Sequence, residues 1–152
     1  MKHVQNMGSN ATRAASAGIL CMKRVEQAIN HHDLDALAEC FEPDYQSEFP
    51  AHLNRAFRGH PSMRKNWSQI FASVPDVHAT LVRAVADGET VWTEWDWKGT
   101  RVDGEVFHHR GVTIQTVPRD RITRTWLYIE PVQSVDPDPG FVVPDTLSEK
   151  KS

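Results

Sequence analysis

The fold of this chain is decided by the stretch Val91-Trp92-Thr93-Glu94-Trp95-Asp96-Trp97-Lys98, whose side chains alternate between two chemistries. Successive side chains of a β-strand point to opposite faces of a sheet. One face of this strand would therefore carry Val91, Thr93, Trp95 and Trp97, and the other would carry Trp92, Glu94, Asp96 and Lys98. This alternation predicts a strand that is buried on one side only.

The two tryptophans on the buried face suggest a pocket as well as a core. Indole rings are among the largest side chains, and aromatic walls are typical of pockets that hold a small apolar molecule. We therefore expect Trp95 and Trp97 to line a cavity, with simple core packing as the alternative. A slip of one residue in register would instead bring Glu94 and Asp96 inside, which would favour an acid-driven hydrolase.

The rest of the chain consists of predicted helices followed by strands. Apolar residues recur at helical spacing in residues 14–30, 34–41 and 61–74, and Pro61 and Pro75 bracket the third helix. From residue 77 to 130 the period changes to two, with turns at 87–88, 103–104 and 118–120 between four strands. This order predicts one α+β domain over residues 14–132, preceded by a flexible leader (1–13) and followed by an extended tail (133–152).

Composition narrows the kinds of partner. The chain has 152 residues, a net charge of -3 and scattered basic residues, which argues against a nucleic-acid footprint and a polybasic membrane patch. No apolar run approaches the roughly 20 residues that span a bilayer. Cys21 and Cys40 fall in predicted helices, where a free thiol usually behaves as a small buried hydrophobe. We expect a cytoplasmic protein with a small hydrophobic molecule as its partner.

Short motifs occur in a fixed order between about residues 15 and 132. They are Leu34 to Phe41, Asp44-Tyr45, Phe57-Arg58-Gly59-His60, Pro75-Asp76, Ala86-Asp87-Gly88, Gly99-Thr100, Asp103-Gly104, Arg121-Ile122 and Tyr128-Ile129-Glu130-Pro131. In this order they resemble the SnoaL-like (polyketide cyclase-like) branch of the NTF2-like superfamily. The resemblance implies a cone, in which three N-terminal helices pack on a strongly curved, mixed but mostly antiparallel sheet that encloses one pocket.

The resemblance also implies a homodimer that forms through the convex face of the sheet. The sequence fits this expectation, because it places large apolar side chains on that face. They are Trp92, Val112, Ile114, Trp126 and Tyr128. A monomer rarely exposes so much contiguous apolar surface.

The resemblance further separates the possible activities. In limonene epoxide hydrolases, an arginine and two aspartates activate a water, but the matching positions here hold Trp95, Trp97 and Leu127. This argues against that activity, although Tyr45 matches the hydrolase tyrosine and Ser47 stands where the hydrolases have an asparagine. In polyketide cyclases, an aspartate and a histidine exchange protons with the substrate. The residue that matches the histidine is His109, and the aspartate has no clear counterpart.

Two residues are candidate catalytic groups. His109 could act as a general base, because an imidazole that faces an apolar cavity titrates near neutral pH; a hydrogen-bonded core histidine is the alternative. Tyr45 could donate a hydrogen bond to a carbonyl or enolate oxygen; a tyrosine at the pocket mouth, with its hydroxyl in solvent, is the alternative. We expect the cavity that holds the ligand to be lined by Ser47, Trp67, Thr93, Trp95, Trp97, Phe107 and Leu127.

The remaining ionisable residues indicate neither a metal nor a cofactor. Glu48, His52 and Arg55 could form a charged lid, but an ordinary loop salt bridge is the favoured interpretation. The histidines occur as adjacent pairs at 31–32 and 108–109, and no H-x-H, H-E-x-x-H or C-x-x-C spacing is present. The leading hypothesis is a cofactor-independent cyclase, isomerase or dehydratase acting on a hydrophobic cyclic carbonyl compound. The alternative is a non-catalytic binding or accessory protein of the same fold.

Overall fold

The computed structural model describes residues 2–133, with side chains from Asn10 onward. The helices are α1 (Lys2–Asn30), α2 (Leu34–Glu39) and α3 (His60–Ser73). Between α2 and α3 lie β1 (Phe41–Glu48), the short 3-10 helix η1 (Leu53–Arg55) and β2 (Phe57–Arg58). A meander follows, made of β3 (His78–Asp87), β4 (Thr90–Thr100), β5 (Val106–Thr116) and β6 (Ile122–Pro131). Its three turns fall where the sequence predicts them.

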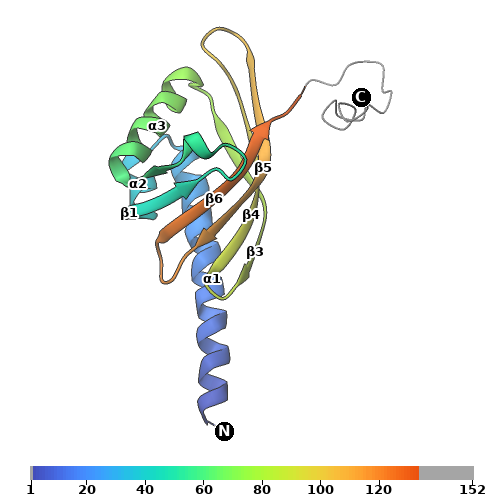
Figure 1. The fold of residues 1–152 in the computed structure, drawn as a ribbon. Coiled ribbons are helices and arrows are strands. Elements are labelled where there is room, and N and C mark those ends of the chain that lie inside the picture. Colours follow the sequence, from blue (N-terminus) through green and yellow to red (C-terminus); the bar gives the residue numbers. More distant parts are fainter. Residues whose placement is uncertain (1, 134–152) are drawn as a thin grey trace, which may run out of the picture.

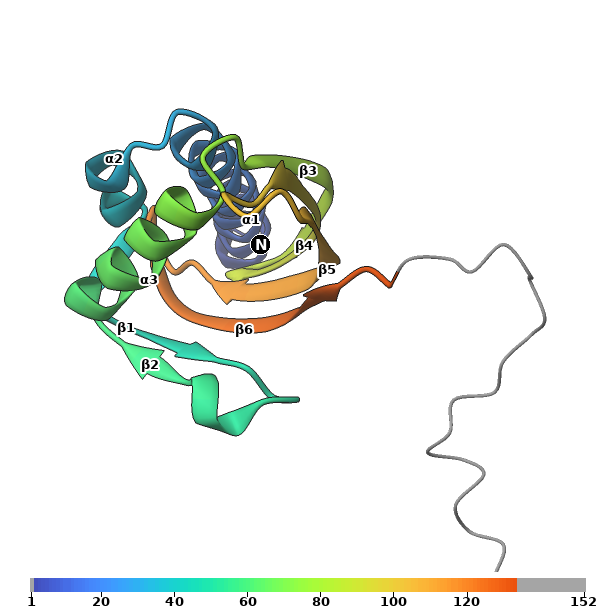
Figure 2. The same cartoon turned by 90° about the horizontal axis from the view of Figure 1, so that it is seen from above.

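The strands form one mixed sheet in the order β2-β1-β6-β5-β4-β3. The pair β1 and β6 is parallel, and every other neighbouring pair is antiparallel. Figure 2 shows the sheet curving around α1, with α2 and α3 on the open side of the curve. The predicted α+β cone, with three helices on a strongly curved and mostly antiparallel sheet, is confirmed. The sheet does not close into a barrel.

Strand β4 has the alternation that the sequence predicts. Val91, Thr93 and Trp95 are at most 2% exposed, whereas Trp92 between them is 48% exposed. The pairing of β4 with β5 continues over its whole length without a shift in register. The tryptophans at 95 and 97 therefore face the concave side of the sheet.

The two acids of β4 lie on the convex face. The Glu94 carboxylate is 2.5 Å from the Arg83 guanidinium, and the Asp96 carboxylate is 2.8 Å from His108 Nε2. Both pairs connect neighbouring strands on the outer surface. The alternative register, with the acids inside, is excluded.

The N-terminal helix differs from its prediction. The expected leader at residues 1–13 is helical instead, because α1 begins at Lys2, and Figure 1 shows its first turns projecting below the sheet. Residues 11–17 include four alanines, and a helix that is already formed extends through such residues at little further cost in free energy. A helix here is hard to predict because residues 1–13 are mostly polar or small.

Closer to the sheet, Gly18 allows α1 to approach β4. A Cβ atom at this position would lie 2.5 Å from Val91 Cγ2. The absence of a side chain at Gly18 thus brings the axis of α1 close to the concave face, where the helix forms one side of the core.

Helix α2 is shorter than predicted. Asp33 caps its start by accepting a hydrogen bond from Ala36 N at 3.0 Å. The helix ends at Glu39, and Phe41 begins β1 opposite Ile122 of β6. Pro43 favours this outcome because it holds the residue before it in the extended region. The third helix matches its prediction, from the first-turn proline to its end before residue 74.

The C-terminal tail expected at 133–152 lies outside the described residues, except for residue 133. Within residues 2–133, no helix is both long enough and apolar enough to cross a membrane.

Candidate functional site

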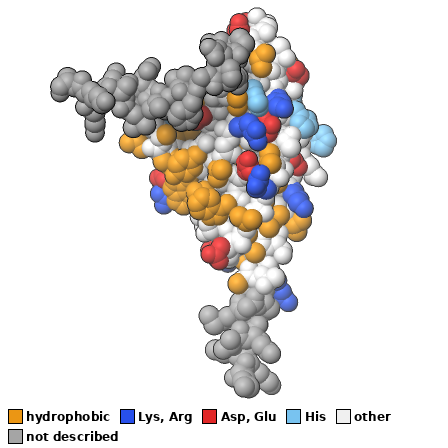
Figure 3. Space-filling view, turned by 90° about the vertical axis from the view of Figure 1, so that its right-hand side faces the viewer, with side chains coloured by type: hydrophobic (Ala, Val, Ile, Leu, Met, Phe, Trp, Pro, Cys, Tyr) orange, Lys and Arg blue, Asp and Glu red, His pale blue; other side chains and the backbone are white. Residues whose placement is uncertain are grey.

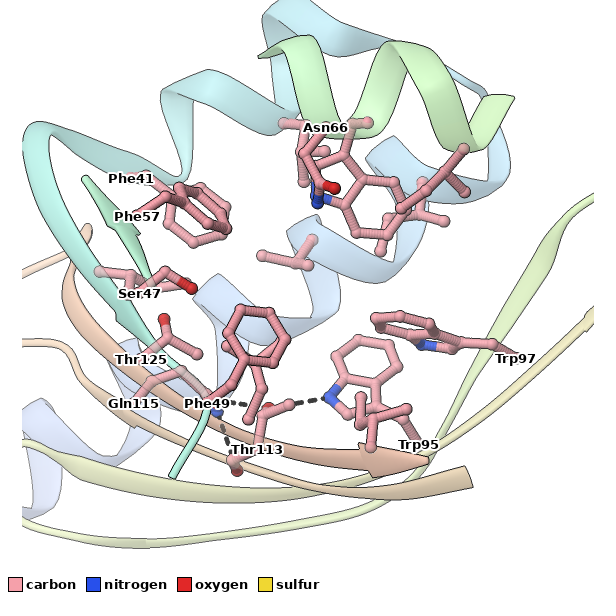
Figure 4. A pocket seen from close by; sticks show the side chains of 18 of the residues that line it. Phe41, Ser47, Phe49, Phe57, Asn66, Trp95, Trp97, Thr113, Gln115 and Thr125 are labelled. Atoms are coloured by element: carbon pink, nitrogen blue, oxygen red, sulfur yellow. Dashed lines mark hydrogen bonds between the residues drawn. The ribbon is translucent and has the colours of Figure 1, made fainter. Parts of the chain in front are cut away.

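A cavity of about 570 Å3 lies between the concave face of the sheet and the three helices. Its volume is in the range of roughly 300–1,000 Å3 that is typical of small-molecule pockets. Three of its lining residues are exposed and mark the mouth: Arg55, Asn66 and Pro131. None of the described residues that line it is an aspartate or a glutamate. In Figure 4, the tryptophans of β4 lie on one side of the cavity, and Ser47 and Thr125 lie on the other.

Three tryptophans form the aromatic wall. Trp67 of α3 and Trp97 of β4 meet with ring centroids 5.5 Å apart, and Trp97 meets Trp95 at 6.3 Å. Both contacts are edge to face, with interplanar angles of 61° and 64°. This geometry suits the ring quadrupoles. All three tryptophans line the cavity.

A buried hydrogen-bond network holds the floor of the cavity. Trp95 Nε1 donates to the hydroxyls of Thr93 at 3.0 Å and Thr113 at 3.1 Å. The side-chain oxygen of Gln115 accepts from the same two hydroxyls, and its amide nitrogen donates to Thr93 Oγ1 and to the carbonyls of Val91 and Thr113. The network fixes the plane of the Trp95 indole, because its only polar atom is bound to two partners.

Tyr45 lies in the deep part of the cavity, not at its mouth. It is 3% exposed, and its ring packs against Phe41 at 4.5 Å and Phe57 at 6.0 Å. Burial raises the pKa of the Tyr45 phenol well above its usual range, since the charged form would lose its hydration. The phenol therefore stays protonated and can donate a hydrogen bond to a ligand oxygen.

His109 lies on β5 directly opposite Trp97 and lines the cavity. Its ring stacks on Phe107 with centroids 4.3 Å apart and an interplanar angle of 17°. Burial lowers the pKa of His109 below its ordinary value, and the positive charge of Arg101 lowers it further. The imidazole is therefore mostly neutral near pH 7, which is the state that a general base requires.

His109 and Tyr45 lie toward different ends of the cavity. His109 is opposite Pro131 on β6, whereas Ser47, two residues after Tyr45, is opposite Thr125. Six residues of β6 separate these two positions, which is about 20 Å along an extended strand. A ligand that reaches both candidate residues would therefore contact them with different parts of its skeleton.

Two of the predicted lining residues do not reach the cavity. Thr93 lies behind its floor, where its hydroxyl belongs to the network with Thr113 and Gln115. Phe107 packs in a second apolar cluster with Val74 and Val77, beyond the His109 ring. The side chains point to the correct face of the sheet, but other side chains stand between them and the cavity. The other predicted residues, Ser47, Trp67, Trp95, Trp97 and Leu127, line it.

Several further polar residues belong to the cavity wall. Thr113 and Gln115 continue the inward-facing series that starts at His109 on β5, and Asn66 precedes Trp67 on α3. The period of two along β5 could have identified the first two. They were overlooked because threonine and glutamine on a strand commonly indicate a solvent-facing side.

The charged residues after β1 do not form a lid together. Glu48 pairs with Arg124 at 2.8 Å, and His52 pairs with Glu130 at 2.6 Å, both to partners on β6. The loop salt-bridge interpretation was therefore correct for these two residues. Arg55 lines the cavity mouth.

Among the described residues, neither an acidic side chain nor a cysteine lines the cavity. Cys21 and Cys40 are free thiols and are 0% and 2% exposed. Within the described part of the chain, no three His, Cys, Asp or Glu side chains are arranged to hold a metal ion.

The chain belongs to the SnoaL-like domain family, whose model matches residues 22–125. This confirms the family that the motifs indicate. No protein with a curated description matches the chain.

Solved structures with the same fold include proteins of several named activities. IdmH from Streptomyces antibioticus, named as a candidate polyketide cyclase, is 22% identical, with 74% of this chain and 91% of that one covered and a TM-score of 0.65. An LEH-like epoxide hydrolase from M. tuberculosis is 18% identical (76% and 84% covered, TM-score 0.66). A candidate ketosteroid isomerase from Kribbella flavida is 17% identical (85% and 87% covered, TM-score 0.64). At these identities the likeness establishes the NTF2-like fold and no activity.

Proposed function

We propose that this protein binds a flat, hydrophobic cyclic carbonyl compound in its cavity and rearranges it by proton transfer without a cofactor. A cyclase, an isomerase or a dehydratase would each work in this way. The observation that carries the proposal is the position of His109, a mostly neutral imidazole on the wall of a cavity with three tryptophans and no lining carboxylate. Such a cavity selects an uncharged, flat molecule and offers it one base.

In this mechanism, His109 takes a proton from a carbon that a carbonyl group has made acidic. The electron pair of that C–H bond moves into the conjugated ring system and places negative charge on the carbonyl oxygen. Tyr45, protonated and buried, donates a hydrogen bond to the oxygen at the inner end of the ligand. The imidazolium then returns the proton, to another carbon in an isomerisation or to a departing hydroxyl in a dehydration.

A second candidate function is binding without chemistry. The observation that favours it is the surroundings of His109: its ring contact is with Phe107, and the cavity lining supplies no carboxylate to orient the imidazole. Many general bases depend on such a partner for their orientation. The two candidates differ in whether a bound carbonyl compound exchanges its acidic protons.

The residues of the cavity give little support for epoxide hydrolysis as the activity. The reaction needs an acid to open the ring and a base to activate water, and acidic residues usually supply both. Trp95, Trp97 and Leu127 occupy the cavity positions where the resemblance would require an arginine and two aspartates. The acids of β4 instead form ion pairs on the convex face.

Hydrogen exchange into a simple ketone separates the two leading candidates. 2-Tetralone is too short to contact Tyr45 and His109 at once, so it reports on the base alone. In deuterated buffer it loses its C1 proton signals in the NMR spectrum, and the wild-type protein should accelerate this loss when the C1 carbon reaches His109. His109→Ala should reduce the acceleration by about 100-fold or more, the usual contribution of a general base. The matched control is His108→Ala, because that neighbouring histidine pairs with Asp96 on the convex face. Equal rates for wild type and His109→Ala, with binding retained, would support the binding protein.

We also propose that two copies of the chain pair through the convex face of the sheet, in the cytoplasm. Figure 3 shows hydrophobic side chains gathered on this side of the molecule, beside a patch of mixed charge. Val85, Trp92 and Tyr128 are 64%, 48% and 45% exposed. The acids and bases of the same face, such as Glu94 and Arg110, could complement a second copy as well as each other.

A further inference from the structure

Three polar residues form a row across the inner end of the cavity. Ser47 on β1 is opposite Thr125 on β6, and Thr125 is opposite Gln115 on β5. All three line the cavity and are at most 7% exposed. We propose that the hydroxyls of Ser47 and Thr125 form a subsite that binds a neutral oxygen of the ligand, and that they orient the ligand with this oxygen inward. This proposal rests on the ligand cavity proposed above.

The third residue of the row is not available for a ligand. Gln115 takes part in five hydrogen bonds, and these use both its side-chain oxygen and its amide nitrogen. They hold the floor of the cavity together. A ligand that bonded to Gln115 would have to break part of that network.

Thr125, unlike Gln115, has a hydrogen-bonding group that is not used. Its Oγ1 atom is buried and has no hydrogen-bond partner. A buried hydroxyl without a partner is destabilising, and native proteins rarely keep one without a reason. The hydroxyl and methyl groups of threonine are similar in size, so a single change of χ1 rotamer can turn the hydroxyl toward a ligand. A ligand oxygen at this position would supply the missing partner.

Ser47 supplies the second hydroxyl of the subsite. It faces Thr125 across the parallel pair of strands, and Figure 4 shows both hydroxyl groups on the side of the cavity away from the tryptophans. Phe41, Tyr45 and Ile122 border this end and are buried. In such a dry environment a hydrogen bond is stronger than in water.

The electrostatics of the subsite determine whether a neutral or a charged ligand oxygen can bind there. The cation in the cavity lining is Arg55, which is exposed at the mouth. A carboxylate or phosphate at the inner end would therefore be buried without a counter-ion, at a large cost in free energy. A carbonyl oxygen fits, because it can accept hydrogen bonds from both hydroxyls. The ring system of the ligand would then extend toward Trp67 and Trp97, and its outer carbons would reach His109.

Two probes of the same shape test this subsite. 9-Fluorenone carries a carbonyl where fluorene carries a methylene, and equilibrium dialysis measures the binding of each. Wild-type protein should bind fluorenone more tightly. Thr125→Val keeps the shape of the side chain and should weaken fluorenone binding about 3- to 10-fold, the equivalent of one hydrogen bond, with fluorene unchanged. Ser47→Ala should have the same effect.

The control variant is Thr123→Val on the same strand, because its hydroxyl bonds to Thr116 O and it does not line the cavity. It should leave the fluorenone-to-fluorene ratio unchanged. The subsite is refuted if both probes bind the wild type and neither Thr125→Val nor Ser47→Ala alters that ratio; the cavity would then remain a binding site. If neither probe binds the wild type, the ligand cavity itself is refuted, and the subsite with it. Thermal unfolding of each variant verifies that it is folded.

Discussion

Trp67 of α3 and Trp97 of β4 meet edge to face across the cavity, with ring centroids 5.5 Å apart. The contact joins the helix layer to the sheet at the mouth side of the cavity, near His109, which is opposite Trp97 on β5. A flat ligand that enters there would pass along the surface of this aromatic pair before it reaches the inner end, because the two rings touch and leave no gap between them. This aromatic pair would therefore contact the proposed ligand near the proposed base.

Replacing Trp67 by leucine should weaken the binding of 9-fluorenone about 3- to 10-fold. Leucine keeps the site apolar but removes an aromatic contact, which is worth about 0.5–1.5 kcal/mol beyond its area. Equilibrium dialysis measures the affinity. Trp92→Leu is the control, because this tryptophan lies on the convex face and should not affect binding. Equal affinities for wild type and Trp67→Leu would show that the helix does not contact the ligand.

Replacing Gln115 by leucine should lower the free energy of unfolding by about 1–3 kcal/mol, because Thr93 and Thr113 lose partners that they cannot replace in the core. Urea denaturation measures the change. Gln46→Leu on β1 is the control: this glutamine is exposed, and its replacement should alter stability by no more than about 0.5 kcal/mol. A similar effect for both variants would mean that the network contributes little.

Much of the fold could be predicted from the sequence because the signals are local. The period of two along β4 and the turns at 87–88, 103–104 and 118–120 depend on residues that are close together in the chain. The pairing of β1 with β6 could not be predicted from such patterns, since its partners are separated by about 80 residues. The N-terminal extension of α1 could not be predicted in this way, because residues 1–13 are mostly polar or small.

The aromatic residues of the site could be predicted from the sequence, whereas polar residues such as Gln115 could not. Trp95 and Trp97 are identified as buried by a local pattern, because they alternate with charged residues along β4. Thr113 and Gln115 carry no such signal, because the same residue types are common on exposed strands, and only the sheet register places them in the cavity. The separation of His109 from Tyr45 also depends on that register, which no single segment of the sequence determines.

Replacing Gly111 by alanine should destabilise the protein by at least about 2 kcal/mol. A Cβ at this position would lie 2.1 Å from Tyr128 O and 2.7 Å from Ile129 Cα, and both are backbone atoms that cannot rotate away. Strands β5 and β6 would have to separate. The comparison is Gly88→Ala, where nothing lies within 4 Å and only the positive φ of 59° is unfavourable, at a cost of about 1 kcal/mol. Equal effects would contradict the close approach of the strands.

Replacing Trp92 by lysine should convert the proposed dimer into a monomer, because it places a charge in the middle of the apolar part of the convex face. Sedimentation velocity at several concentrations measures the mass. Val102→Lys is the control, since Val102 is 73% exposed in the turn between β4 and β5. A wild-type protein that sediments as a monomer at all concentrations would refute the dimer.

The pH dependence should follow the lowered pKa of His109. Because burial and the charge of Arg101 both disfavour the imidazolium, the pKa of His109 in the folded protein should be below the ordinary value of 6.5. The exchange rate with 2-tetralone should therefore fall on the acid side with a midpoint below pH 6.5, where half of the base is protonated. The unfolded chain binds this proton more readily than the native protein, so the His109 contribution to stability should also decrease as the pH falls through 6.5.

Titration of the imidazole carbon-bound protons by NMR measures this pKa directly, and His109→Gln identifies the signal by removing it. Arg101→Gln should raise the pKa of His109 only partly toward 6.5, because burial is the larger cause and persists in the variant. A midpoint at or above 6.5 in the wild type would mean that the imidazole is better hydrated than its place beside Phe107 implies. His109 would then be largely charged just below neutral pH, and the acid limb of the exchange rate would move up with it, so the two measurements must agree if this residue is the base.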